Sequence, residues 1–205
     1  MAICTFRYII GSMSRTRTFD LDEAADQALH VFWSKGYEGT SLSDLTEAMG
    51  INRPSLYAAF GSKEGLFERA LARYVAKQGA AMESALAAGT GREAVYRLLR
   101  FYSDAVGRAD RPRGCLLVQG ALVCGAEGQN VRSALTDQRN LAEQAIVSRL
   151  ERAKREGDLP KSASPADLGR YVMTVSQGLA VQAVGGATRE QLRRVVDLAM
   201  GAWPD

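Results

Sequence analysis

Histidine and long apolar runs are both scarce in this chain of 205 residues. The single histidine, His30, falls beside the apolar stripe of a predicted helix, where we expect it to pack, and no Ser–His–Asp set can be assembled around it. No apolar run approaches the roughly 20 residues that a membrane-spanning helix needs. We therefore expect no enzymatic activity, no catalytic residue and no membrane partner.

Cysteine is also scarce, with three residues that show no framework spacing. An odd number of this kind predicts reduced thiols in the cytoplasm. Cys115 and Cys124 stand at the two ends of one strongly apolar stretch. On a continuous helix they would be about 2.5 turns and roughly 13 Å apart along the axis. At that separation they could not share a metal or a disulfide. We expect them to pack as small apolar residues, and we predict no metal site and no resident cofactor.

Segments that alternate apolar and polar residues, as β-strands do, are nearly absent. Apolar residues recur at helical spacing instead, and Gly, Pro and capping Ser, Thr or Asp residues separate the runs. The pattern predicts an all-α chain of about nine helices, over residues 21–35, 42–49, 53–60, 63–88, 92–108, 115–124, 130–156, 167–184 and 189–201.

The stretch Thr40–Lys63 describes two short helices that meet at a tight turn. Ser41 is a good N-cap for the first helix, and Gly50 suits a left-handed C-cap. Asn52 can cap the second helix, and Pro54 lies in its first turn, where a missing N–H is harmless. Leu56 and Phe60 share one face of this helix and leave short polar residues on the other. The spacing is typical of a helix-turn-helix whose second helix can enter a DNA major groove.

Two short helices around a glycine also occur as an ordinary helical hairpin, so spacing alone leaves both interpretations open. Residues 18–66, however, resemble the DNA-binding domain of tetracycline-repressor-like (TetR-like) regulators along their whole length. The residues that carry this resemblance are Phe32, Gly36-Tyr37, Thr40-Ser41, Leu45, Ala48-Met49-Gly50-Ile51, Ser55-Leu56-Tyr57, Phe60 and Ser62-Lys63-Glu64-Gly65-Leu66. The resemblance implies a ligand-responsive transcriptional regulator that acts as a repressor. It also implies an N-terminal three-helix helix-turn-helix domain and a C-terminal helical domain for ligand binding and dimerisation.

The candidate DNA contacts lie on and beside the second motif helix. Residues 1–77 hold nine Lys or Arg and nine Asp or Glu, so this segment has no net charge that would attract DNA. Binding to double-stranded operator DNA must therefore depend on where individual basic residues lie. Arg53 can pair bidentately with guanine, Ser and Tyr hydroxyls can bind phosphates, and Lys63 lies at a helix N-terminus that suits a phosphate. The alternative for each candidate is that it is an ordinary solvated residue with no role in DNA binding. The candidates are Thr40, Ser41, Ser43, Asn52, Arg53, Pro54, Ser55, Tyr57 and Lys63.

The last two predicted helices carry more apolar residues than one domain of this size can bury, among them Val175 and Val196. The alternative is that these residues form the core of a monomer. The resemblance implies that the two helices pair with their copies in a homodimer, and two heads on a two-fold axis imply a palindromic operator.

A small-molecule effector is expected from the resemblance, without its identity. Candidate pocket residues mix aromatic side chains with a few polar groups, although each of them could equally be core. They are Phe101, Tyr102, Cys115, Gln119, Tyr171, Thr174 and Gln177. Gly114-Cys115-Leu116-Leu117 also resembles the C-terminal domain of a TetR-like branch that includes a copper-responsive repressor. The alternative of another class is therefore a helical thiol or metal sensor that does not bind DNA.

The expected organisation has three parts. Residues 1–14 look like a leader, either disordered or the product of an early translation start, because Met13 begins the short basic run typical of such regulators. The alternative is a genuine extension that packs on a neighbour. Residues 15–62 form the predicted helix-turn-helix domain, and residues 63–205 form the predicted ligand-binding and dimerisation domain.

Overall fold

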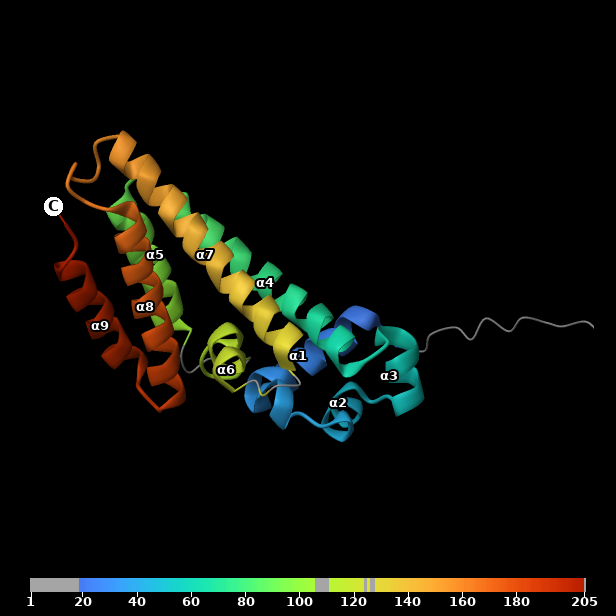
Figure 1. The fold of residues 1–205 in the computed structure, drawn as a ribbon. Coiled ribbons are helices and arrows are strands. Elements are labelled where there is room, and N and C mark those ends of the chain that lie inside the picture. Colours follow the sequence, from blue (N-terminus) through green and yellow to red (C-terminus); the bar gives the residue numbers. More distant parts are fainter. Residues whose placement is uncertain (1–18, 106–110, 124, 126–127, 205) are drawn as a thin grey trace, which may run out of the picture.

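The computed structural model describes residues 19–105, 111–123, 125 and 128–204. Over these residues the chain forms nine α-helices and no strand, which confirms the all-α prediction (Figure 1). The helices are α1 (Leu21–Gly39), α2 (Leu42–Met49), α3 (Arg53–Phe60), α4 (Lys63–Leu86), α5 (Gly91–Asp104), α6 (Leu116–Val123), α7 (Gln129–Arg155), α8 (Pro165–Val184) and α9 (Arg189–Gly201). The predicted leader lies outside the described residues. No helix in the described part is long and apolar enough to cross a bilayer.

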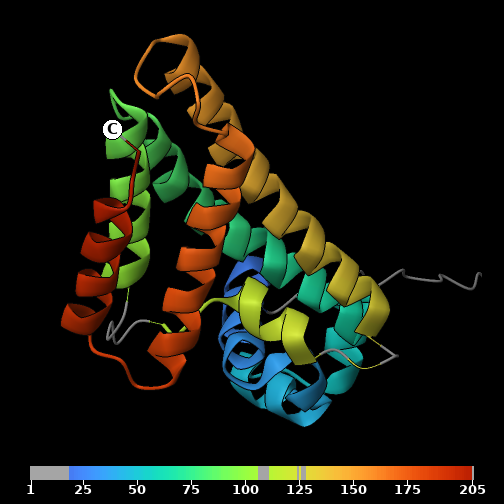
Figure 2. The same ribbon diagram turned by 60° about the vertical axis from the view of Figure 1, so that its left-hand side comes forward.

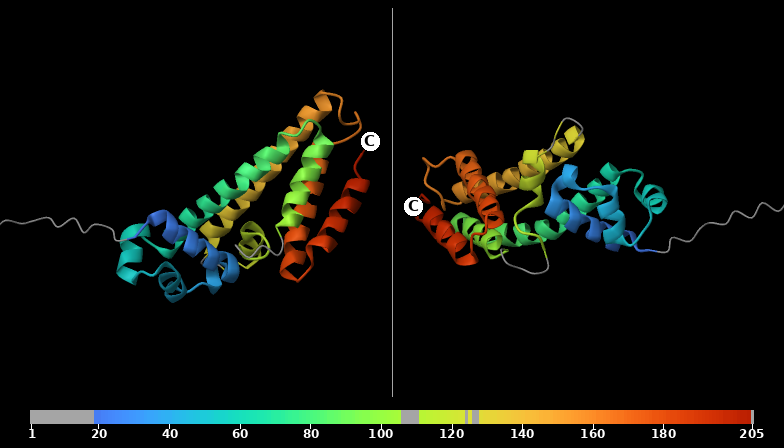
Figure 3. Two further views of the ribbon diagram at one scale, coloured as in Figure 1. Left: turned by 180° about the vertical axis from the view of Figure 1, so that it is seen from behind. Right: turned by 90° about the horizontal axis from the view of Figure 1, so that it is seen from below.

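Two groups of helices lie at opposite ends of a long central pair, α4 and α7 (Figures 1 and 3). Helices α1–α3 gather around the start of α4 and form what we call the head. Helices α5, α8 and α9 pack at the other end. The short α6 lies between the two groups, where it contacts both α1 and α7 (Figure 2).

Two apolar cores follow this division, and α4 contributes to both. In the head, Phe32, Leu45, Leu56 and Phe67 are fully buried, and Leu116 of α6 belongs to the same cluster. The second core joins α5, α7, α8 and α9 and receives Ala85 from the far end of α4. Burial of each large apolar side chain stabilises the fold by roughly 1.5–3 kcal/mol, so Leu66, Phe67 and Leu71 hold the start of α4 in the head. At the far end, Ala85 is buried in the second core and Met82 and Leu86 pack against it.

Polar contacts also fasten α4 at both ends. At the head, Asp26 of α1 accepts hydrogen bonds from Arg73 at 2.7 and 2.6 Å and from Lys77 at 2.8 Å, and Asp22 pairs with Arg69 at 2.6 Å. We call these five residues the α1–α4 clamp. At the far end, the buried Arg149 of α7 donates to the carbonyl oxygens of Leu86 and Ala88, at 3.0 and 2.8 Å.

The helices and their side chains differ in part from the sequence predictions. Gly36 does not end α1: it kinks the helix with a φ of 74°, and the chain continues helically to Gly39. His30 is exposed, so the expected packing role is wrong. The helix expected to run from Cys115 to Cys124 begins at Leu116, so Cys115 lies just before it, and Cys124 is outside the described residues.

Candidate nucleic-acid interface and effector cavity

The helix-turn-helix is built by local capping, as its sequence predicts. Ser41 and Asp44 form a reciprocal capping box at the start of α2. Gly50 ends α2 in the left-handed conformation, with a φ of 64°, which is strained for other residues. Asn52 caps α3 by accepting a hydrogen bond from the Ser55 N–H at 2.9 Å. These caps fix the turn, and the fully buried Leu45 and Leu56 fix the angle between the helices.

The outer face of α3 carries accessible polar groups. Arg53 and Pro54 in its first turn are exposed, and Tyr57 keeps 46% of its surface accessible. The Arg53 guanidinium donates a hydrogen bond from Nη2 to Ser43 Oγ on α2, at 2.9 Å. Ser43 therefore holds the arginine along the outer edge of both helices. Ser41 and Asn52 are also exposed, and Ser55 is partly exposed.

Thr40 requires a correction. Only 1% of its surface is exposed, and its hydroxyl donates to the carbonyl oxygen of Gly36 at 2.6 Å. This bond holds the end of α1 to the start of the motif. Because the side chain is enclosed and already bonded, the structure does not support Thr40 as a direct DNA contact.

Lys63 begins α4 and is positioned by an aromatic ring. Its ammonium lies over the Tyr37 ring, 4.4 Å from the centroid, which is a cation–π arrangement. Partial burial lowers the pKa of Lys63 from its usual value, while the charges of Glu38 and Asp44 oppose that shift. Asp44 itself is bound by Lys35 at 2.6 Å, and this hydrogen bond is the main reason that its pKa is lowered to about 2. The charge of the Asp44 carboxylate near Lys63 is thus largely neutralised by Lys35.

An apolar face is exposed on the last two helices. Val181 and Val184 of α8 and Val195 and Leu198 of α9 keep between 45 and 76% of their surface accessible. Val196, in contrast, is completely buried within the chain and belongs to the second core. The residues available to a partner are therefore the neighbours of Val196 on α9 rather than Val196 itself.

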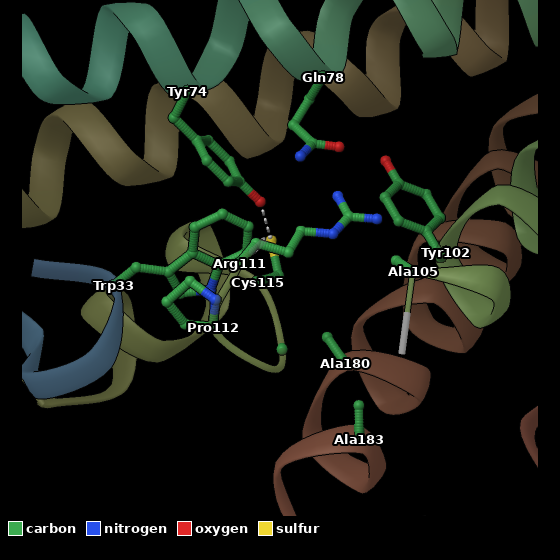
Figure 4. Close-up of a pocket in the computed structure, with 11 residues that line it drawn as sticks. Trp33, Tyr74, Gln78, Tyr102, Ala105, Arg111, Pro112, Cys115, Ala180 and Ala183 are labelled. Carbon is green, nitrogen blue, oxygen red and sulfur yellow. Dashed lines mark hydrogen bonds between the residues drawn. The ribbon is translucent and has the colours of Figure 1, made fainter. Parts of the chain in front are cut away.

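A small cavity of about 30 Å³ lies where the head meets the C-terminal helices (Figure 4). Its wall includes Trp33 of α1, Tyr74 and Gln78 of α4, Tyr102 of α5, Arg111, and Cys115. The Tyr74 hydroxyl donates to Cys115 Sγ at 3.2 Å. Burial is the main cause that raises the pKa values of Tyr74 and Tyr102, and the neighbouring Cys115 adds to both shifts.

Of the seven predicted pocket residues, Tyr102 and Cys115 line this cavity. The Tyr171 hydroxyl donates to the Ala199 carbonyl at 3.1 Å and thereby joins α8 to α9. Thr174 is exposed, and Gln119 donates to the Arg113 carbonyl at 3.3 Å. Phe101 and Gln177 are partly buried outside the cavity wall. The structure does not gather these five residues around the cavity.

Sequence reasoning missed Trp33, Tyr74, Gln78 and Arg111 as cavity residues. These residues come from α1, α4 and the segment before α6, which are separate in sequence. No local sequence pattern shows that α6 packs on α1. The sequence therefore does not show that the cavity residues lie close together. Among the described residues, no group of three or more His, Cys, Asp or Glu side chains is placed to hold a metal ion.

Two segments of the chain match known families. Residues 25–70 match the family described as bacterial regulatory proteins, tetR family, and residues 91–199 match the tetracyclin repressor-like, C-terminal domain. The transcriptional repressor ComR of Escherichia coli K12 is 30% identical, over 100% of this chain and 99% of ComR. The uncharacterised regulator YezE of Bacillus subtilis is also 30% identical, over 92% of this chain and 98% of YezE.

A solved structure agrees closely with the whole architecture. It is a cysteine-substituted form of the TetR family regulator CifR, in complex with 26 base pairs of its operator DNA. It is 44% identical in sequence, covers 93% of this chain and 100% of CifR, and superimposes with a TM-score of 0.90.

Proposed function

This chain belongs to the TetR family of bacterial regulatory proteins, and from that membership we propose that it is a ligand-responsive repressor that binds palindromic operator DNA as a homodimer. The observation that carries the proposal is the outer face of α3, where Arg53, Pro54 and Tyr57 are exposed on a helix fixed by caps on both sides of the turn. This face suits the major groove.

The proposed contacts divide into two kinds. Arg53 reads a base edge, because a guanidinium matches the two acceptors of guanine. Ser41, Ser43, Asn52, Ser55 and Tyr57 bind the phosphates beside it, and Pro54 packs against the groove wall. Lys63 binds a phosphate at the start of α4, where its charge adds to the helix N-terminus.

Homodimerisation places two such heads on one duplex. The accessible apolar face of α8 and α9 supports a symmetric interface of four helices, because its copies bury each other's valines and Leu198. A two-fold axis then sets the two α3 helices on successive major grooves, which are about 34–36 Å apart. The operator is accordingly palindromic.

The cavity is the proposed effector site. Its wall joins α1 of the head and the central helix α4 to α5 and α8, which belong to the C-terminal group. A ligand can release DNA only if it binds two states of the dimer with different affinity. A site shared by both groups of helices meets that requirement, because a change in their relative position changes the cavity.

The test is a mobility shift with the full chain on the intergenic DNA beside its own gene and on a scrambled duplex of equal length. We expect specific binding at nanomolar protein concentration and an affinity that falls steeply as salt rises. Equal affinity for both duplexes, or no binding to either of them, would overturn the proposal.

A further inference from the structure

The two central helices, α4 and α7, run side by side (Figures 1 and 3) and leave an open groove between them. Its volume is about 510 Å³, within the roughly 300–1,000 Å³ typical of small-molecule sites. None of its residues lines the cavity where the head meets the C-terminal helices. We call it the α4–α7 groove, and it is a second candidate site.

The groove has an apolar wall on α4. Met82 and Leu86 line it and pack against the second core with their other side. Gly79 lines it one turn before Met82, and apart from the chain beside it nothing lies within 4 Å of the position that a Cβ would take there. From Gly79 to Leu86 the helix advances about 10 Å. The wall therefore suits an elongated apolar body.

Arg149 of α7 brings a buried positive charge to the groove. Only 5% of its surface is exposed, and its Nε and Nη2 donate to the carbonyl oxygens of Leu86 and Ala88. These two nitrogens share one edge of the planar guanidinium, so Nη1 lies on the other edge. Nη1 is buried and has no hydrogen-bond partner among the described residues. Buried donors normally have a partner, so this one lacks an acceptor that a ligand could supply.

Arg152 adds a second guanidinium on the same face of α7, three residues after Arg149. It is exposed, and its ion pair with Glu156 is long, at 3.8 Å. An exposed pair of this kind contributes little, so Arg152 can turn toward the groove at small cost. The hydroxyl of Ser148, one turn before Arg152, lies on the same wall.

Glu83 of α4 supplies the negative charge of the groove. Its side chain is exposed and can turn toward water. With two arginines and one glutamate, the groove remains positive, but the glutamate opposes a ligand of high negative charge. A single carboxylate fits this balance better than a phosphate ester does.

We propose that the α4–α7 groove binds a medium-chain carboxylate, with the carboxylate at Arg149 and Arg152 and the alkyl chain along Met82 and Leu86. The carboxylate accepts hydrogen bonds from Arg149 Nη1 and from the Arg152 guanidinium, and both are charge-assisted. Because Nη1 is covered in the free chain, binding requires a shift of the flexible Met82 side chain. Any effect on DNA rests on the proposed function: a chain lodged between α4 and α7 changes how these helices lie together.

The first test measures binding in the absence of DNA. The full chain is titrated calorimetrically with octanoate, below the concentration at which it forms micelles, and with acetate, octanamide and octylammonium. We expect saturable binding of octanoate, with one molecule per chain and about tenfold higher affinity than for octanamide or acetate. No binding of octanoate, or affinity for octanamide or octylammonium equal to that for octanoate, overturns the proposal.

Substitutions of charged residues then locate the carboxylate. Arg152→Gln should weaken octanoate binding about fivefold to tenfold, and Glu83→Gln should strengthen it. Arg155→Gln is the matched control, because Arg155 is an exposed arginine one turn further along α7 and does not line the groove. Arg149→Lys, which keeps the charge but removes Nη1, should weaken binding more than Arg152→Gln does. Equal affinity in Arg152→Gln and Arg155→Gln overturns the placement of the carboxylate.

A substitution that fills the groove tests the site without touching the arginines. Ala145 of α7 lines the groove and is exposed, so Ala145→Phe should fold, occupy the space of the alkyl chain and abolish octanoate binding. Ala80→Phe is the control, because Ala80 of α4 is exposed outside the groove. If Arg149→Lys does not fold, this pair decides. Parental affinity in Ala145→Phe would show that octanoate binds elsewhere.

Operator titration separates this inference from the proposed function. Octanoate should change the operator affinity of the parent chain about threefold or more, and should not change that of Ala145→Phe. If the parent chain binds octanoate but no operator, the proposed function fails while the groove site remains. If it binds the operator but not octanoate, the groove site is wrong while the repressor function remains. Binding of both without mutual effect overturns the link between groove and head.

Discussion

Arg53 and Ser43 lie on different helices of the head and are joined by a hydrogen bond of 2.9 Å from Nη2 to Oγ. The bond holds a long side chain along the outer edge of α3 before any DNA is present. Much of the rotamer entropy that an arginine loses on binding is therefore lost already in the free protein, which favours binding.

Arg53→Ala should weaken binding to the cognate operator by about 1–3 kcal/mol and relax the base preference at one position of each half-site, because a bidentate contact to guanine is lost. Fluorescence anisotropy with the operator and its single-base variants measures both effects. Arg97→Ala on α5, an exposed arginine far from the head, is the control and should change neither. Parental affinity in Arg53→Ala would mean that α3 does not read DNA through this residue.

Ser43→Ala removes the partner of the guanidinium and leaves Arg53 in place. We expect a smaller loss than for Arg53→Ala, about 0.5–1.5 kcal/mol, because the variant removes only the solvent-exposed hydrogen bonds of the Ser43 hydroxyl, to Arg53 and to the proposed phosphate. A double-mutant cycle with Arg53→Ala measures the coupling. Strict additivity of the two losses would show that the bond has no part in DNA binding.

Lys63→Gln keeps most of the side chain on the Tyr37 ring and removes the charge. It should weaken binding to operator and scrambled DNA by the same factor and lower the slope of log affinity against log salt by about one. Lys161→Gln, an exposed lysine between α7 and α8, should leave the slope unchanged. A loss confined to the operator would contradict a phosphate contact.

Leu198→Arg places a charge at the centre of the proposed dimer interface. Because Leu198 is 76% exposed in the single chain, the variant should fold but sediment as a monomer, and its affinity for the full palindrome should fall. Leu141→Arg on α7 is the control: this leucine is 56% exposed outside the proposed interface, so the variant should remain dimeric. A monomeric Leu198→Arg with parental operator affinity would be incompatible with two heads acting together.

The α1–α4 clamp predicts a dependence of stability on pH. Hydrogen bonds from Arg73 are the main cause that lowers the pKa of Asp26, so its contribution is complete above the unfolded pKa of about 3.9 and is lost as the pH falls toward the lower folded value. Asp26→Asn should therefore destabilise the chain by about 1 kcal/mol at pH 7, and the difference should shrink below about pH 4. Urea unfolding of both proteins at pH 7 and pH 3.5 measures it; a constant difference would show that the Asp26 charge contributes nothing.

The helix-turn-helix was predictable because it is built from neighbours in sequence. Ser41, Gly50 and Asn52 specify the ends of α2 and α3 by their own chemistry, and the apolar spacing specifies the inner face. Periodicity shows which residues share a face of a helix, but not whether that face meets the chain's own core or a partner. For that reason Val196 appeared in the sequence as an interface residue, although it lies in the core and Leu198 is the accessible neighbour.

The cavity was not predictable for a related reason. Trp33 and Cys115 are far apart in the chain and meet because α6 packs on α1, a contact that depends on the tertiary arrangement of whole helices. Tyr171 and Thr174 have the composition of pocket residues, but the first holds α9 and the second faces solvent. The residue types therefore predicted that a pocket exists, but not which residues line it.

Because α4 is fastened to the head by the α1–α4 clamp and to α7 by Arg149, we expect the head and α4 to turn together, about the far end of the helix. With 24 residues α4 is about 36 Å long, so a tilt of about 5° displaces its first turn, and α3 beside it, by about 3 Å. That displacement is as long as a hydrogen bond to a phosphate. We therefore expect a change of a few degrees in the angle between α4 and α7 to be enough to move the two heads of the proposed dimer off two successive major grooves.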